Sequence, residues 1–382
     1  MPGASGVRRA ARFLRGTFYR SLSDAVRILV RKGGRNACLV IKIDALGDLF
    51  VWFSSGIADV AAEARAAGRH TVLVARPELV KFLEEQGLFD EIWPLDTGRF
   101  RRDLGYRLQM LARFRRFGFS RILQMRHSRE SLQEDAIVRA IGAQQAQSPV
   151  GDRHNMSDAE ARSGDRLYTP LLQSPAGHEL DRNRAATTAL TGKPATRFRM
   201  RLTTPLPEAI TAPYWVIAPG AGWDKRKWPA GHFAAVAGQL PGHQCVVVGT
   251  REDIAAGDAI AQAAGGINLC GTLSLSQLPA VISGASLVLA NESGLSHMAA
   301  YFGVPSVAIL GGGHYGWFMP YPDNVPELAA PVCAVHPMPC FGCNWQCIYP
   351  LSPQRPVPCI ENVSLEAVQA AIRTALAGAV PN

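Results

Sequence analysis

The 382-residue sequence has little charge for its length, because Asp, Glu, Lys and Arg make up 19% of it and hydrophobic residues 47%. This balance excludes a disordered chain or a coiled coil. It also lacks a long uninterrupted apolar run. The segment between Glu292 and Asp323 contains no charged residue, but Gly303, Pro305 and the glycines at 311–313 divide it into short pieces typical of a buried α/β core.

Several familiar sequence signals are also missing. No apolar segment follows the basic N-terminal stretch as in a secretory signal, so we expect a cytoplasmic protein. No repeat of about 20–50 residues is present, which excludes solenoids and propellers. We find no Walker phosphate loop, no HExxH zinc motif and no Ser–His–Asp order. The sequence therefore does not indicate a nucleotide hydrolase, a zinc protease or a serine hydrolase.

Positive charge is concentrated in two regions rather than spread along the chain. Residues 1–35 contain nine Lys or Arg and one acidic residue, Asp24, and the segment from Arg99 to Arg129 contains ten Arg and one acidic residue, Asp103. Such clusters usually face an anionic partner. Few aromatic residues lie beside them and no nucleic-acid motif accompanies them, so we expect no nucleic-acid partner.

Two interpretations remain open for the basic extension over 1–35. It is a frayed basic tail, or it is an amphipathic helix that contacts the inner face of a bacterial inner membrane peripherally. Phe18, Leu22, Val26 and Leu29 recur at helical spacing and favour the second interpretation.

Short apolar runs alternate with helical stretches through most of the chain, which is the pattern of parallel sheets covered by helices on both faces. We expect an α/β protein with two Rossmann-like domains and a ligand cleft between them. One helix is predicted over 49–67. The predicted boundaries are a basic extension at 1–35, a first domain at 36–192, a linker at 193–213, a second domain at 214–362 with a Cys-rich segment at 333–359, and a terminal helix and tail at 363–382.

The first candidate site is a strand that runs into the Leu46-Gly47-Asp48 turn at the start of a helix. Asp48 falls at the carboxyl edge of the predicted sheet, where active-site residues of such folds gather. It is a candidate general base. A helix-capping role is the alternative, and Asp44 could compete for the role of base.

The second candidate site is the loop Pro219-Gly220-Ala221-Gly222 followed by Lys225, Arg226 and Lys227. Small residues allow the backbone to approach a phosphate, and the cations can neutralise a diphosphate. A solvated basic loop is the alternative interpretation.

The third candidate site is the segment 291–297, which begins with Asn291, contains Glu292, Ser293, Gly294 and His297, follows a buried strand and opens a helix. Amides at the helix start would bind an anion, and His297 lies one turn further along. A purely structural histidine is the alternative.

Four cysteines form the last cluster, Cys340, Cys343, Cys347 and Cys359. Their spacing permits a structural zinc site but lacks the paired knuckles of a zinc ribbon. Reduced structural thiols and a disulfide are the other interpretations, and we favour no metal.

These motifs, in this order, resemble glycosyltransferase family 9, the heptosyltransferases of lipopolysaccharide assembly. The resemblance rests on the Leu-Gly-Asp turn at 46–48, the Pro-Gly-Ala loop ending in Lys227-Trp228-Pro229, and the Glu-Ser-Gly-x-x-His segment at 292–297, and it spans about 37–377. It implies a GT-B fold and inverting transfer of heptose from ADP-heptose to an anionic, lipid-linked saccharide of the lipopolysaccharide inner core. It implies no obligatory metal or cofactor.

The resemblance also implies a role for each matched position. Asp48 corresponds to the carboxylate that deprotonates the acceptor. The residues implied to bind the donor are Gly220, Ala221, Gly222, Lys225, Arg226, Lys227, Glu252 (ribose), Thr272 and Leu273 (adenine side), Glu292, Ser293, Gly294 and His297.

The sequence departs from the family at two positions of the donor site. The family commonly has Asp at the position of Glu292 and Lys at the position of Arg226. The sugar preference and the identity of the diphosphate-binding cation therefore stay open. The alternatives are a family 9 transferase with another donor sugar or a protein acceptor, a sugar-nucleotide epimerase, and a non-enzymatic basic binding protein.

Overall fold

The computed structural model describes residues 3–240, 242–325 and 327–378, with side chains from Arg15 onward. Three arginines of the basic extension, Arg8, Arg9 and Arg12, have side chains outside the described part of the chain. The chain divides into two compact units. Unit 1 comprises 1–44, 55–175 and 181–198, and unit 2 comprises 45–54, 176–180 and 199–382. The segments 45–54 and 176–180 thus join unit 2, which differs from the boundaries expected from sequence.

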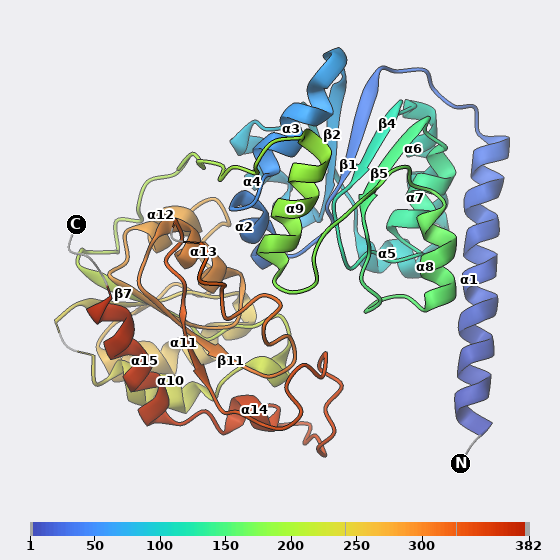
Figure 1. Cartoon of the computed structure of the whole chain (residues 1–382). Coiled ribbons are helices and arrows are strands. Elements are labelled where there is room, and N and C mark those ends of the chain that lie inside the picture. Colours follow the sequence, from blue (N-terminus) through green and yellow to red (C-terminus); the bar gives the residue numbers. More distant parts are fainter. Residues whose placement is uncertain (1–2, 241, 326, 379–382) are drawn as a thin grey trace. The chain divides into compact units, whose positions relative to one another are not determined.

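Unit 1 is a six-stranded parallel sheet in the order β3-β2-β1-β4-β5-β6 (Figure 1). Its elements are α1 (Gly3–Leu29), β1 (Ala37–Ile41), α3 (Ile57–Arg65), β2 (His70–Ala75), α4 (Val80–Gln86), β3 (Glu91–Pro94), α5 (Thr97–Arg102), α6 (Leu104–Phe117), β4 (Arg121–Gln124), α7 (Glu134–Ile141), β5 (Gln145–Pro149), α8 (Asp158–Asp165), β6 (Leu171–Leu172) and α9 (Glu179–Thr191), whose first two residues cluster with unit 2.

The core of unit 1 lies between the sheet and the helices α5, α6 and α7. Leu39, Ile41 and Ile122 of the central strands contact Leu111 and Phe114 of α6 within one buried cluster. Strand β1 is buried along its whole length and reads as a continuous apolar run, whereas the equally buried β4 carries Arg121 and Gln124 at its two ends.

Unit 2 repeats this topology, with a parallel sheet in the order β12-β11-β10-β7-β8-β9. Its elements are α2 (Leu46–Phe53), β7 (Tyr214–Ala218), α10 (Ala230–Ala237), β8 (Gln244–Val247), α11 (Ile254–Ala264), β9 (Ile267–Asn268), α12 (Leu278–Ser283), β10 (Leu287–Asn291), α13 (Gly294–Phe302), β11 (Ser306–Leu310), β12 (Val332–Val335), α14 (Pro358–Glu361) and α15 (Leu365–Ala377).

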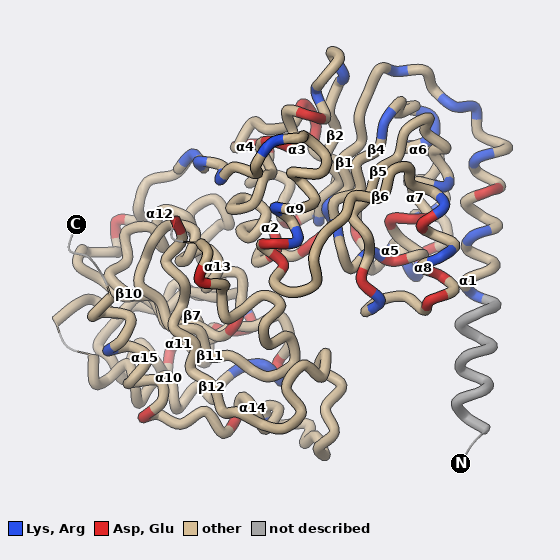
Figure 2. The backbone as a smooth tube through the Cα atoms, in the orientation of Figure 1, with Lys and Arg blue, Asp and Glu red and all other residues tan. Residues whose placement is uncertain are grey.

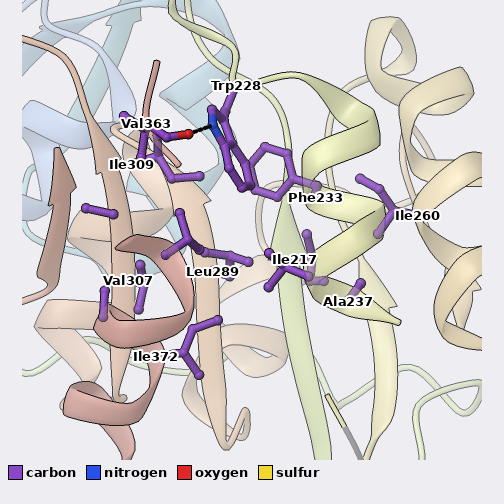
Figure 3. Close-up of a cluster of buried hydrophobic side chains, with 14 of the residues drawn as sticks. Ile217, Trp228, Phe233, Ala237, Ile260, Leu289, Val307, Ile309, Val363 and Ile372 are labelled. Carbon is purple, nitrogen blue, oxygen red and sulfur yellow. Dashed lines mark hydrogen bonds between the residues drawn. The ribbon is translucent and has the colours of Figure 1, made fainter. Parts of the chain in front are cut away.

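Strand β11 shows how the sheet of unit 2 separates two cores. Val307 and Ile309 belong to the larger cluster with Phe233 of α10 and Ile372 of α15 (Figure 3), whereas Ala308 and Leu310 pack on the other face. This alternation follows from the two-residue period of a strand. The α/β architecture expected from sequence is therefore confirmed.

The helix predicted over 49–67 is divided in the structure. Helix α2 ends at Phe53, and Gly56, whose φ of 116° lies in the left-handed region, is the N-cap from which α3 begins at Ile57. A Cβ at Gly56 would approach the side chain of Thr187 to 2.6 Å. Apolar periodicity continues through both helices, so the sequence pattern alone did not reveal the break.

Several arginines of the segment over 99–129 are paired with carboxylates within unit 1. Arg121 pairs with Glu63 at 2.8 Å, Arg126 pairs with Glu134 at 2.9 Å, and Arg129 pairs with Asp135 at 3.3 Å. Buried charges require such partners. The expectation that this segment as a whole presents positive charge to an anionic partner is therefore wrong for these three residues.

Candidate functional site

The strand order of unit 2 places the second and third sequence motifs side by side. β7 and β10 are neighbours, with Ala218 in register with Ala290, and the chain leaves them in opposite directions of the strand order. Ligands of doubly wound sheets bind at such switch points, beyond the carboxyl ends of the strands. The loop at 219–229 follows β7 and the segment at 292–294 follows β10.

The buried amide of Asn291 joins these two segments. Its Nδ2 donates to the backbone oxygen of Pro219 at 2.7 Å, and its Oδ1 accepts from the backbone N–H of Trp228 at 3.0 Å. The indole of Trp228 is buried and donates to the oxygen of Val363 at 2.9 Å (Figure 3). Both ends of the loop are therefore attached to the core. Asn291 opens the third sequence motif, but the sequence assigned it no role.

The structure separates the three consecutive cations of the loop. Lys225 donates to the backbone oxygens of Ser352 and, at 3.0 Å, of Arg355. Lys227 lies 3.0 Å from both Asp224 and Asp253. These two lysines therefore attach the loop to neighbouring segments of unit 2.

Arg226 alone of the three cations faces the end of β10. Its guanidinium donates to the backbone oxygen of Glu292 at 3.0 Å and lies 3.1 Å from the carboxylate Oε2 of the same residue. It also stacks on the indole of Trp345, 4.7 Å from the ring centroid. Burial raises the pKa of Glu292 above its usual range even though Arg226 opposes the shift.

The start of α13 lies against the start of α2. A Cβ at Gly294 would meet the side chain of Leu46 at 3.0 Å, and one at Gly47 would meet the ring of His297 at the same distance. Ser293 precedes the helix with extended backbone, and within the described residues its buried Oγ has no hydrogen-bond partner. A helix start with a free hydroxyl and nearby amides is suited to an anion.

Asp48 is half-buried in the first turn of α2. Its carboxylate accepts a hydrogen bond from the backbone N–H of Ala45 at 3.2 Å, so the helix-capping contact of the alternative interpretation is present. A capping bond occupies one lone pair of a carboxylate that has several. This contact is compatible with a second role as a base.

Asp44, the competing carboxylate, is part of an ion-pair network in unit 1. It lies 3.0 Å from Lys42 and 2.6 Å from Arg126. Two cations at this distance favour the charged form of a carboxylate and weaken it as a base. Asp44 is therefore the poorer candidate.

His297 is buried and neutral. Its Nδ1 lies 2.8 Å from the hydroxyl of Tyr321, and the two rings stack at 5.7 Å. Burial, reinforced by His178 and Arg226, lowers the pKa of His297 to about 3. It can thus offer an N–H to an anion but no full positive charge. Tyr321 carries no sequence signal, because it lies outside all of the motifs.

The remaining predicted donor residues lie on loops at the same edge of the sheet. Glu252 is exposed in the turn after β8, whereas its neighbour Asp253 is buried against Lys227. Thr272 is exposed and Leu273 half-buried in the loop after β9. Gly220, Ala221 and Gly222 follow β7, and Gly222 has open space around it. The contacts of these residues with a donor stay predictions.

The cysteine cluster lies behind the glycine loop after β11. Cys340, Cys343, Cys347 and Cys359 line one small cavity together with Trp345, and all four are free thiols. Gly312 donates its backbone N–H to the Sγ of Cys359 at 3.4 Å. Over the described ranges, no three His, Cys, Asp or Glu side chains are grouped closely enough to hold a metal ion.

Replacing Asn291 with Leu should destabilise unit 2. The substitution leaves the N–H of Trp228 and the oxygen of Pro219 buried without partners, at a cost of roughly 2–4 kcal/mol in the free energy of unfolding. Urea unfolding measures this loss. Gln369→Ala is the control. It removes an exposed hydrogen bond between the side-chain amides of Gln369 and Gln239 and should change the free energy of unfolding by less than about 0.5 kcal/mol. Equal effects of the two substitutions would contradict the anchoring role.

The neutral state of His297 should make stability depend on pH. In the unfolded chain this histidine binds a proton below about 6.5, whereas in the folded chain it does so only near 3, so protonation favours unfolding in between. The free energy of unfolding should therefore fall as the pH is lowered through this window. His297→Gln should reduce the slope, measured by urea unfolding at several pH values. Parallel curves for the two proteins would show that His297 is not buried neutral.

Comparison with known proteins agrees with these features. A sequence model described as glycosyltransferase family 9 (heptosyltransferase) matches residues 136–343. Lipopolysaccharide heptosyltransferase 2 of Escherichia coli K12 is 37% identical over 102 residues, which is 24% of this chain. The match spans 29% of that relative's length.

The similarity to solved structures extends over nearly the whole of both chains. E. coli ADP-heptose lps heptosyltransferase II aligns with a TM-score of 0.60 and 18% identity, covering 89% of this chain and 98% of its own. E. coli heptosyltransferase WaaC with ADP-2-deoxy-2-fluoro heptose gives a TM-score of 0.63 and 14% identity, covering 88% and 99%. The expected GT-B fold is thereby confirmed. With the family match over more than half of its residues, the chain belongs to glycosyltransferase family 9.

Proposed function

We propose that this protein is an inverting glycosyltransferase that moves a heptosyl residue from ADP-heptose to an inner-core acceptor of lipopolysaccharide. Family membership supports the reaction class, since the family description names heptosyltransferases. The E. coli structure with ADP-2-deoxy-2-fluoro heptose supports an ADP-sugar as donor. The curated relative supports a lipopolysaccharide acceptor, which is anionic and lipid-linked.

The position of Arg226 is the observation that carries the donor assignment. Lys225 and Lys227 are engaged elsewhere, while Arg226 lies at Glu292, directly before the start of α13. A guanidinium beside a helix N-terminus matches a diphosphate in both charge and hydrogen-bonding geometry. Arg226 therefore takes the place of the lysine commonly found in the family, with the hydroxyl of Ser293 and the N–H of His297 as further donors.

The proposed reaction uses these groups for the departing ADP and Asp48 for the acceptor. Asp48 removes the proton of the acceptor hydroxyl while the hydroxyl oxygen of the acceptor forms a bond to the anomeric carbon of heptose. The bond from that carbon to the diphosphate oxygen breaks on the opposite side, and its electron pair leaves with ADP. Negative charge develops on the diphosphate, so stabilisation by Arg226 and the α13 amides acts mainly in the transition state.

Calorimetric titration with ADP, UDP and GDP, without added metal, tests the donor assignment. We expect selective binding of ADP. Preference for UDP or GDP would contradict ADP-heptose as the donor. It would instead favour a family 9 transferase with another donor sugar or a sugar-nucleotide epimerase. Incubation of ADP-heptose with and without a lipopolysaccharide acceptor then separates transfer from epimerisation by the products.

Arg226→Gln should weaken ADP binding by about 10–100-fold, because a charge-assisted hydrogen bond contributes roughly 1.5–3 kcal/mol. Arg373→Gln removes an exposed cation on α15 of the same unit and is the matched control. It should bind ADP like the unmodified protein. An Arg226→Gln variant with unchanged ADP affinity would remove this residue from the donor site.

Asp48→Asn should lower turnover by about 10²–10⁴-fold, which is the usual contribution of a general base. Asn keeps a side-chain oxygen that can accept from Ala45, so the helix cap is retained and melting temperature and ADP affinity should stay unchanged. Asp48→Ala removes both functions and should also lower the melting temperature. Turnover of Asp48→Asn close to normal would show that the carboxylate serves only as a cap.

A further inference from the structure

Helix α1 is packed against unit 1 through one of its faces. Val26 is buried in the core of unit 1. The hydroxyl of Tyr19 donates to the oxygen of Arg101 at 3.3 Å, and the guanidinium of the buried Arg107 stacks on the Tyr19 ring at 4.4 Å. The helix is therefore an integral layer of the unit outside α6 and α7 rather than a frayed tail.

The connection from α1 to β1 is also held firmly. A Cβ on Gly33 would lie 2.1 Å from the backbone oxygen of Arg116, so only glycine fits where the chain crosses the end of α6. Lys32 donates to the oxygen of Gly142 at 2.8 Å, and Nε of Arg115 donates to the oxygen of Val30 at 3.1 Å. These contacts determine which face of the helix is turned outward.

The outward face carries large apolar side chains. Phe18 is 52% exposed, Ile28 79% and Leu29 81%. At 3.6 residues per turn these three positions fall within about 100° of the helix circumference, so they form one stripe. The stripe expected from sequence is corrected in one respect, because Val26 lies on the packed face and Ile28 belongs to the exposed one.

Exposed cations lie along the described part of this helix and directly after its end. Arg15, Arg27, Arg31 and Arg35 are exposed, and Figure 2 shows basic residues along the described part of α1. The acidic residue of this segment, Asp24, lies 3.6 Å from Arg139. The pKa of Lys32 is lowered by burial and by Arg115 and Arg27, which indicates a surplus of positive charge at this end of the helix.

We propose that the outward face of α1 docks on an anionic lipid surface, with Phe18, Ile28 and Leu29 entering the interface and the arginines contacting acidic headgroups. A nucleic acid would use the cations and leave the apolar stripe in water, and a second copy would bring like charges together. An anionic bilayer surface can accommodate both the apolar side chains and the arginines of this helix. Helix α1 lies on the membrane rather than across it, since no helix in the described part of the chain is long and apolar enough to span one. Docking of α1 on a lipid surface does not depend on the proposed transferase reaction.

Co-sedimentation of the full-length protein with phosphatidylcholine vesicles and with vesicles of 70% phosphatidylcholine and 30% phosphatidylglycerol tests the proposal. We expect binding to the anionic vesicles that weakens as salt is added. The double substitution Ile28→Ser, Leu29→Ser should reduce it at least about tenfold. Arg15→Gln and Arg31→Gln should each reduce it about fivefold, as expected for one basic residue near an anionic surface.

Two substitutions in unit 2 serve as matched controls. Ile348 is 72% exposed and Arg373 is exposed, so Ile348→Ser and Arg373→Gln remove the same kinds of side chain elsewhere and should leave vesicle binding unchanged. ADP affinity, measured on the same preparations, should be equal for all of these variants.

Three results would overturn the proposal. The first is equal binding to neutral and anionic vesicles, or binding to neither. The second is unchanged binding of the Ile28→Ser, Leu29→Ser protein. The third is a self-association, or an affinity for duplex DNA, that is abolished by the same double substitution while vesicle binding persists.

Discussion

The geometry of the candidate donor site depends on one buried amide. Asn291 ends β10 and bonds both ends of the loop that follows β7, so the two segments after neighbouring parallel strands are held in one arrangement. The parallel register brings the strand ends together, but register alone does not orient the loop at 219–229. The amide does so because a buried N–H or C=O without a partner is costly. Trp228, attached to the core by its indole, prevents the far end of the loop from moving.

Because the loop is anchored in this way, its three adjacent cations point to different parts of unit 2. Lys225 and Lys227 point to separate parts of unit 2 and stabilise the loop, while Arg226 is turned toward Glu292 and α13. The stacking of Trp345 on Arg226 links this arginine to the cysteine-lined cavity, since the same indole lines that cavity. The Cys-rich segment therefore helps to orient Arg226 through the stacked indole of Trp345.

Burial also determines the charges available to a ligand. His297 is kept neutral, and the pKa of Glu292 is raised, because both groups are removed from water. The lowered pKa means that His297 presents no positive charge, so the guanidinium of Arg226 and the dipole of α13 are the positive features beside the start of this helix. In unit 1 the half-buried Arg126 and the buried Arg129 are paired with carboxylates and therefore present little net charge.

The fold class, the order of the three motifs and the candidate residues could be predicted from the sequence, because the strands of parallel α/β units are mostly apolar runs and their ligand-binding loops contain glycine turns. The sequence did not reveal strand β5 or the edge strands β6 and β12, whose pairing depends on neighbours distant in sequence. The sequence also could not predict which cation of the loop faces the start of α13 or which face of α1 is turned outward. Both depend on contacts with distant segments, such as Asn291 with Trp228 and Gly33 with α6, that no local pattern contains.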